Sequence, residues 1–351
     1  MSINNIIPID KLSVLFLIPV YLKNTNTRQF NTYLSVLFLI CSYCLIGYTY
    51  NSDHSILIFY PILFIFLSVL AGNLEQNPNI LITPLKFNIA FGIFAVILAV
   101  FGIYTPGCID QLGRGIAFIP GPVGFMPTIQ VYGTLCISLI ILLIETGRGK
   151  SIWMYIACAA IFVSLNRASL VFLFLILLMY RPKTATFVAL LSLCAILYFD
   201  TLYDYVFSIS TLISRSNLRL GAELSYWNSD NTIIHLFGRG THMTSEFIAS
   251  RTIWERRYIE NGIDFLFHSY GFFGFMIYSL FTLYVFYVTI KARQIKLLIF
   301  SIYYYLIEQI LTNEFLSPSI CFFSTTIFFL SKNNITANYT SEKNLNNTSI
   351  R

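Results

Sequence analysis

The stretch FLFHSYGFFGFMIYSLFTLYVFYVTI, residues 265–290, contains no acidic side chain, no lysine and no arginine. An α-helix needs about 20 predominantly apolar residues to cross a bilayer, so this stretch is long enough. Its apolar residues run continuously instead of alternating with polar ones, which favours a helix over a strand of a membrane barrel. The sequence therefore predicts a transmembrane helix here, and much of the chain repeats the pattern.

The whole chain has the composition of a membrane protein. Of its 351 residues, 56% are hydrophobic and 11% are charged, with a mean hydropathy of +0.71, whereas soluble domains carry about 25% charged residues. This excludes an ordinary soluble enzyme, a disordered protein and a conventional nucleic-acid binder. We predict an all-α, polytopic transmembrane helical bundle of about eleven spans, near residues 10–22, 33–50, 55–72, 87–104, 127–144, 151–165, 168–180, 184–199, 265–290, 297–312 and 316–330.

These spans divide the chain into four regions. Residues 1–199 hold eight predicted helices and a loop at 105–126, whose prolines exclude a continuous helix and whose apolar residues suit the membrane edge. Residues 200–264 form a large external loop, and residues 265–330 hold the last three helices. The polar tail, 331–351, is predicted to be disordered and cytoplasmic.

Lysine and arginine in the short connections predict the orientation. With eleven spans, one side, which the positive-inside rule assigns to the cytoplasm, receives Lys23, Arg28, Lys86, Arg148, Lys150, Arg181, Lys183, Lys291, Arg293, Lys296 and the basic residues of the C-terminal tail. The C-terminus is then cytoplasmic and the N-terminus external, although the N-terminus lies inside if 10–22 is not a span. A second interpretation makes 151–180 one long helix, which would put Arg181 and Lys183 outside, whereas a hairpin with its turn at Asn166-Arg167 keeps them inside.

The loop 200–264 is predicted to carry the chemistry. It holds eight of the sixteen acidic residues and six arginines but no lysine. The planar fork of arginine suits bidentate contacts to phosphate or carboxylate, and pairing with the local acids is the alternative. Arg114 and Arg167, outside this loop, either contact a ligand or stabilise external turns.

The seven cysteines predict no metal site. Cys41 and Cys44 lie three residues apart inside an apolar run, so we interpret them as small apolar helix residues. No cluster of histidine and cysteine has the spacing of metal ligands. We therefore expect neither a metal nor another cofactor.

Three segments carry a resemblance to a known family. Residues 258–278 read YIENGIDFLFHSYGFFGFMIY, an acidic stretch followed by Y-G-x-x-G, while residues 236–240 read LFGRG and residues 166–169 read NRAS. Their order and spacing resemble those of Wzy-type O-antigen and capsular polysaccharide polymerases, over roughly residues 150–290 and in overall topology. The matching positions in the first segment are Glu260, Asp264, Tyr270, Gly271, Gly274 and Phe275.

The resemblance implies a metal-independent glycosyltransferase with a GT-C-like architecture in the bacterial inner membrane, its large loop on the periplasmic side. Donor and acceptor would be polyprenyl-diphosphate-linked oligosaccharides, and a chain-length regulator would be a further partner. Arginines would stabilise the leaving diphosphate, and we expect this of Arg251, Arg167, Arg114, Arg239 and Arg257. A carboxylate or imidazole would take the proton of the acceptor hydroxyl, with Glu260, Asp264 and His268 as the candidates.

Other functions stay open. A flippase or another transporter of lipid-linked oligosaccharide would need cations inside the bundle, whereas the spans are nearly free of charge apart from Arg167 and Glu308. An O-antigen ligase shares the architecture but usually carries a His-Asn/Ser pair upstream of the glycine pair, where this chain has Ile259 and Glu260. A structural assembly partner would not explain arginine without lysine. At Gly271 and Gly274, close helix packing is the alternative.

Overall fold

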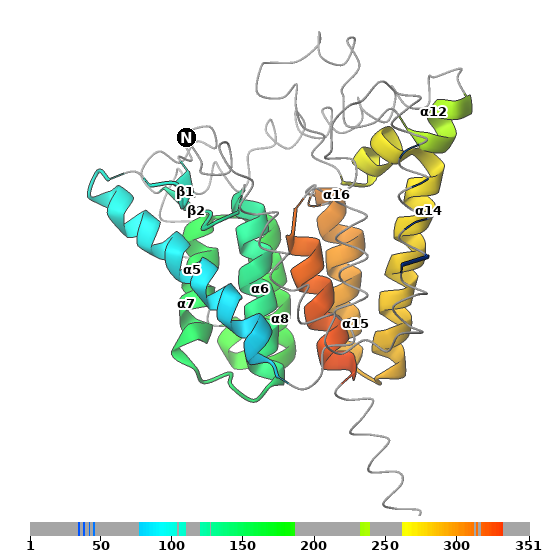
Figure 1. Cartoon of the computed structure of the whole chain (residues 1–351). Coiled ribbons are helices and arrows are strands. Elements are labelled where there is room, and N and C mark those ends of the chain that lie inside the picture. Colours follow the sequence, from blue (N-terminus) through cyan, green and yellow to red (C-terminus); the bar gives the residue numbers. More distant parts are fainter. Residues whose placement is uncertain are drawn as a thin grey trace, which may run out of the picture.

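The computed structural model describes residues 34, 35, 38, 42, 45, 77–103, 105–109, 120–126, 128–186, 232–238, 262–311, 314 and 317–332. The predicted spans 10–22 and 55–72, and most of 33–50 and 184–199, lie outside these residues. The helices are α5 (Asn79–Val100), α6 (Ile129–Glu145), α7 (Ile152–Ser164), α8 (Arg167–Tyr180), α12 (Thr232–Phe237), α14 (Gly262–Lys291), α15 (Ile295–Ile302), the π-helix η6 (Tyr303–Glu308), α16 (Gln309–Leu311) and the C-terminal helix Ser319–Lys332 (Figure 1).

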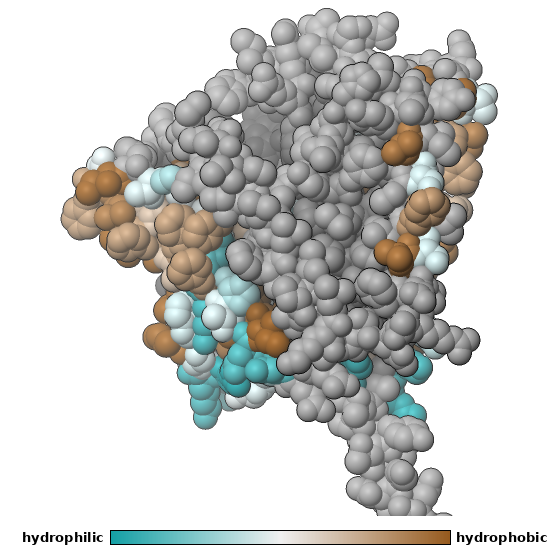
Figure 2. All heavy atoms as spheres, viewed as in Figure 1, coloured by the Kyte–Doolittle hydropathy of each residue, from teal (hydrophilic) through white to brown (hydrophobic). Residues whose placement is uncertain are grey.

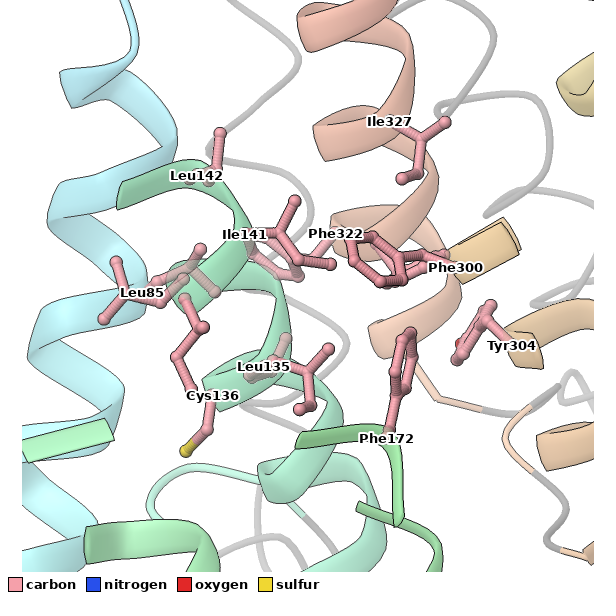
Figure 3. Close-up of a cluster of buried hydrophobic side chains, with 14 of the residues drawn as sticks. Leu85, Leu135, Cys136, Ile141, Leu142, Phe172, Phe300, Tyr304, Phe322 and Ile327 are labelled. Atoms are coloured by element: carbon pink, nitrogen blue, oxygen red, sulfur yellow. The ribbon is translucent and has the colours of Figure 1, made fainter. Parts of the chain in front are cut away.

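Helix α6 lies at the centre of the described bundle. It contacts α5, α7 and α8, and its residues 131–143 are all buried. Its apolar side chains join one core with those of α8, α15, η6 and the C-terminal helix (Figure 3). In this core Phe172 packs against Tyr303 and Tyr304 packs against Phe323, with ring centroids 4.6 and 4.1 Å apart. A helix apolar on all sides and surrounded by other helices is typical of the interior of a large or membrane bundle.

Two of the described helices, α5 and α14, are long and apolar enough to cross a membrane. Each leaves large apolar side chains exposed, among them Phe94 on α5 and Leu283 on α14. Figure 2 shows hydrophobic residues along the two edges of the molecule that these helices form. In water such faces would favour association with another surface, whereas lipid tails would cover them.

The basic residues of the helix connections gather at one end of the bundle, which we call the basic end. Arg148 donates to Asn79 at the start of α5 (2.6 Å), and Arg181 donates to the Gly149 carbonyl (2.7 Å). The ammonium of Lys296, at the start of α15, lies 4.0 Å from the ring centroid of Tyr180. We call the opposite end, with the α7–α8 turn and the start of α14, the far end (Figure 1). That the basic end faces the cytoplasm stays a prediction.

The hairpin interpretation of 151–180 is confirmed, and the single-helix alternative is wrong. Helix α7 ends before Leu165, which adopts the left-handed conformation with φ +48°, and α8 begins at Arg167. The two helices contact each other and return the chain to the basic end. One left-handed residue is enough to reverse the direction, because it stops the helical hydrogen-bond ladder.

Two predicted helix boundaries are wrong. The predicted span 87–104 is α5, Asn79–Val100, which ends before Gly102 with φ +82°. Lys86, predicted in a connection, therefore lies within the helix, and its ammonium reaches over the ring of Trp153, 5.3 Å from the centroid. Its long apolar stem allows this placement, because the charged head can move away from the apolar face.

Two other predicted spans are helical but irregular. Helix α14 bends at Gly271, whose φ of +64° and ψ of −162° are not helical. The span 297–312 consists of α15, η6 and α16, so it widens into a π-helix at its middle. Such π-helical turns occur frequently at functional sites, and this one brings Glu308 into the core.

The described parts of the loop 105–126 form no continuous helix, as its prolines predicted. Strands β1 (Cys108–Ile109) and β2 (Gly121–Pro122) pair antiparallel, and the Gly107 carbonyl accepts the N–H of Gly124 at 2.9 Å. The Asn88 side chain, in α5, accepts the Phe125 N–H at 2.8 Å. The loop is thus supported by the buried face of α5.

Candidate functional site

Three of the predicted site residues lie in the described part of the chain, all at the far end. Arg167 is the first residue of α8, and Asp264 and His268 lie one turn apart near the start of α14. Both of the latter are buried, His268 with 2% of its surface exposed. The remaining candidates lie outside the described residues: Arg114, Arg239, Arg251, Arg257 and Glu260.

The two glycine motifs meet backbone to backbone. Gly238 follows α12 with φ +77°, and Gly271 forms the bend of α14. A Cβ built on Gly238 would lie 2.4 Å from the Tyr270 nitrogen, and one on Gly271 would lie 2.6 Å from the Gly238 nitrogen. Only glycine permits this approach, because any side chain would overlap the backbone of the other segment. The interpretation of Gly271 as a close-packing residue is therefore confirmed.

The bend separates a short first segment of α14, residues 262–270, from the rest of the helix. This segment carries Asp264, His268 and Ser269, all buried. A carboxylate in the first turn of a helix is favoured by the positive end of the helix dipole. A carboxylate and an imidazole one turn apart are two groups that can accept a proton from a hydroxyl, and the glycine contact fixes their position.

The α7–α8 turn presents Arg167 at the start of a helix. In this turn the Asn166 amide donates to the Ser169 hydroxyl at 2.7 Å, and Ser169 packs so closely on α6 that a Cβ on Gly133 would lie 2.1 Å from its oxygen. A cation is unfavourable at a helix N-terminus, because the dipole is positive there. An anionic ligand beside Arg167 would be attracted by both the guanidinium and the helix N-terminus, and the choice between a ligand and stabilisation of the turn stays a prediction.

Two buried carboxylates lie next to this turn. The Thr134 hydroxyl, on α6, lies 2.8 Å from Glu314 Oε1 and 3.5 Å from Glu308 Oε1. Glu314 Oε2 accepts the hydroxyls of Tyr304 at 3.0 Å and Ser319 at 2.6 Å. Both glutamates have 0% of their surface exposed. Burial raises the pKa of Glu314, in the turn between the last two helices, and the hydroxyl donors act in the opposite direction.

The arginine turn and the carboxylates belong to one polar layer. Gly133, which touches Ser169, precedes Thr134, which donates to Glu314. The Tyr303 hydroxyl donates to the Ala168 carbonyl at 2.9 Å, and the neighbouring Tyr304 donates to Glu314. The start of α8 is thus connected to the carboxylate pair through two pairs of adjacent residues, Gly133–Thr134 and Tyr303–Tyr304.

The sequence reasoning did not assign this carboxylate pair. Glu308 is a charged residue inside a predicted span, and such residues are functional candidates by default. Glu314 gave no such signal, because it lies in a short polar connection, TNEFLSPS, between two apolar runs. Thr134, which joins the two, lies on a helix distant in sequence, so only the fold reveals the pair.

Comparison of the sequence with protein-family models and with curated proteins finds no match. Within the described ranges, no three residues among His, Cys, Asp and Glu are grouped to hold a metal ion. The described far end carries a guanidinium, an imidazole and three carboxylates, which come from three helices and one turn. Such a set can bind an anion and move a proton.

Proposed function

We propose that this chain is a membrane polymerase of the Wzy type. It joins polyprenyl-diphosphate-linked oligosaccharide repeat units into O-antigen or capsular polysaccharide at the outer face of the bacterial inner membrane. The backbone contact between Gly238 and Gly271 carries the proposal. Two motifs that the resemblance recognises only by order and spacing are in contact, and they hold two of the three candidate proton acceptors, Asp264 and His268, in place.

The reaction transfers the growing glycan from its lipid carrier to the sugar of a second carrier. The acceptor hydroxyl oxygen forms a bond to the anomeric carbon of the donor, while the bond from that carbon to the diphosphate oxygen breaks. The diphosphate leaves with the electron pair, and arginines stabilise its charge. The proton of the hydroxyl passes to Glu260, Asp264 or His268.

Arg167 is the diphosphate-binding candidate with described surroundings. Arg167 begins α8. The positive end of the helix dipole and the positive guanidinium would therefore both attract a phosphate group. The other diphosphate-binding arginines in the proposal are Arg114, Arg239, Arg251 and Arg257.

Deletion of the gene, with a complemented control, tests the reaction class through the surface glycan separated on a gel. Loss of the ladder with survival of a single-repeat band is the expected result. Loss of every repeat unit, with lipid-linked units held on the cytoplasmic face, would identify a flippase. Polymer accumulating on its lipid carrier would identify a ligase, and an unchanged ladder would remove the polysaccharide proposal.

Variants in the complemented strain test the roles, with protein level measured in each. We expect Arg167→Gln to abolish the ladder and Arg167→Lys to weaken it, because lysine keeps the charge but loses the bidentate fork. The matched control is Arg148→Gln, which removes an arginine bonded to Asn79 at the basic end and is expected to leave the ladder intact. Comparison of Asp264→Asn with His268→Gln then identifies which group accepts the proton.

A further inference from the structure

The carboxylate pair Glu308 and Glu314 has a geometry that the proposed function does not use. Both side chains are fully buried, and both approach the same Thr134 hydroxyl. That hydroxyl has a single proton, so it can donate to only one of them. Two carboxylates this close in an apolar interior do not both ionise, because each opposes the charge of the other.

The hydrogen bonds distinguish the two members. Glu314 accepts from three hydroxyls, those of Thr134, Tyr304 and Ser319. Donors to both oxygens favour the ionised form of a carboxyl group. The described interactions of Glu314 include no lysine, arginine or histidine, so these hydroxyls and a neighbouring proton are what balance its charge.

The other groups around the pair come from each element packed on it. Helix α6 contributes Thr134, and the turn and C-terminal helix contribute Ser319. The π-helix η6 contributes Tyr304 and also Tyr303, which interacts electrostatically with Glu308. Of these described groups, the ones that can titrate are the two tyrosines, which stay neutral at ordinary pH.

A buried amide points to a further ligand of the pair. The Gln309 side chain is fully buried, and its Oε1 accepts the Glu314 backbone N–H at 3.4 Å. This bond places the amide at the Glu314 turn, yet its Nε2 donates to nothing in the described chain. A buried donor of this kind normally has a partner, and water fulfils this role in many proteins.

We propose that Glu308 and Glu314 form a proton-binding site. One proton resides on Glu308 beside the ionised Glu314, and a water bound by Gln309 Nε2 carries the proton to and from the pair. The site is distinct from the candidate proton acceptors on α14 and does not depend on the proposed polymerase activity. The pair lies in the same polar layer as Arg167, which the proposed polymerase activity uses.

Infrared spectroscopy of the purified full chain, titrated from acid to alkaline pH, tests the site without any activity assay. The wild type is expected to keep the carbonyl band of a protonated carboxylic acid at neutral pH and to lose it in alkali. Glu308→Gln removes that band. Glu314→Gln keeps the band but shifts its loss to lower pH, because the neighbouring charge is gone. Glu145→Gln, at the basic end, leaves the band and its titration unchanged.

Three results would overturn the proposal. They are absence of the band from the wild type at neutral pH, persistence of the band in Glu308→Gln, and an unchanged titration in Glu314→Gln. If a glutamate variant does not fold, Thr134→Val keeps both carboxylates and must still shift the band frequency, because it removes the shared hydroxyl. Transfer to heavy water tests the water: Gln309→Leu must slow the deuterium shift of the band, and an unchanged rate contradicts the carrier role.

The pH dependence of stability gives an independent measurement. An unfolded glutamate loses its proton near pH 4.3, whereas the folded state keeps one on Glu308 above that value. The folded state then binds more protons, so stability falls as pH rises from about 4.3 towards the pH at which Glu308 ionises. Glu308→Gln is expected to flatten this slope, and an equal slope in the variant and the wild type contradicts the site.

Discussion

The far end and the basic end of the bundle both carry charge, but they accommodate it in opposite ways. At the far end Glu314 is fully buried and receives three hydroxyl bonds between 2.6 and 3.0 Å. At the basic end Arg148 bonds to Asn79 on the exposed surface, and Lys296 lies over the ring of Tyr180. Charge at a surface costs little, whereas buried carboxylates destabilise a fold unless they are well bonded. Stability alone therefore does not account for the far end.

Glycine substitution should show the largest difference between the ends. Gly271→Ala adds a Cβ 2.6 Å from the backbone of residues 236 and 238, at a backbone conformation that essentially only glycine adopts. We expect a loss of more than about 3 kcal/mol, because overlap adds to backbone strain. Gly147→Ala, at the basic end, has φ +74° but open space around it, so it should cost about 1 kcal/mol.

Thermal unfolding in detergent and the yield of folded protein measure both glycine variants. Equal losses for Gly271→Ala and Gly147→Ala would mean that the α12 segment moves away freely from α14. The contact between the two motifs would then contribute little to stability, and the main support for the proposed function would fail.

Tyrosine-to-phenylalanine changes test how the far end holds its charge. Tyr304→Phe removes one donor from the Glu314 carboxylate, and a hydrogen bond to a charged group contributes about 1.5–3 kcal/mol. Tyr278→Phe removes a bond of 2.7 Å to the backbone carbonyl of Tyr305, which should cost about 1 kcal/mol. Unfolding midpoints of the two variants give the comparison, and an equal loss would indicate that Glu314 is neutral.

The helical fold and the grouping of basic residues could be predicted because each rests on local sequence. The apolar runs predicted the boundaries of α6, α7 and α8 nearly correctly, and the charge pattern predicted the turn at Asn166. The error at Lys86 has a physical cause, since a lysine near a span end can remain in the helix and extend its side chain outward.

The candidate site could be predicted only where one segment carried the signal. Arg167, Asp264 and His268 each stood out in their own stretch, and the structure places all three at one end. The contact of Gly238 with Gly271 and the sharing of Thr134 by Glu308 and Glu314 are pairings between distant segments. No local pattern reports them, because they depend on how the helices pack.

At the basic end, loss of a partly buried bond should exceed loss of an exposed one. Arg181→Gln removes the 2.7 Å bond to the Gly149 carbonyl and is expected to cost about 1 kcal/mol. Arg148→Gln removes an exposed bond to Asn79 and should change stability by less than about 0.5 kcal/mol. Chemical unfolding in detergent measures both, and a cost for Arg181→Gln as small as that for Arg148→Gln would show that the α6–α7 connection does not depend on it.

The smallest effect should come from Glu145, a carboxylate at the basic end. Burial raises the pKa of Glu145, and the charge of Lys296 opposes the shift; the carboxylate also accepts the Tyr180 hydroxyl. Because the folded pKa lies above the unfolded value of about 4.3, this contribution to stability is complete below that pH and is lost as pH rises through the folded pKa.

Lys296→Gln should raise the pKa of Glu145 further and extend this pH window upward. The ammonium of Lys291 lies over Tyr287, so Lys291→Gln should leave the window unchanged. The slope of unfolding midpoint against pH is the measurement, because loss of the Lys296–Tyr180 contact shifts all midpoints equally and leaves the slope alone. A slope unaffected by Glu145→Gln would show that solvent screens this half-buried group, and the contrast with the fully buried pair at the far end would be sharper.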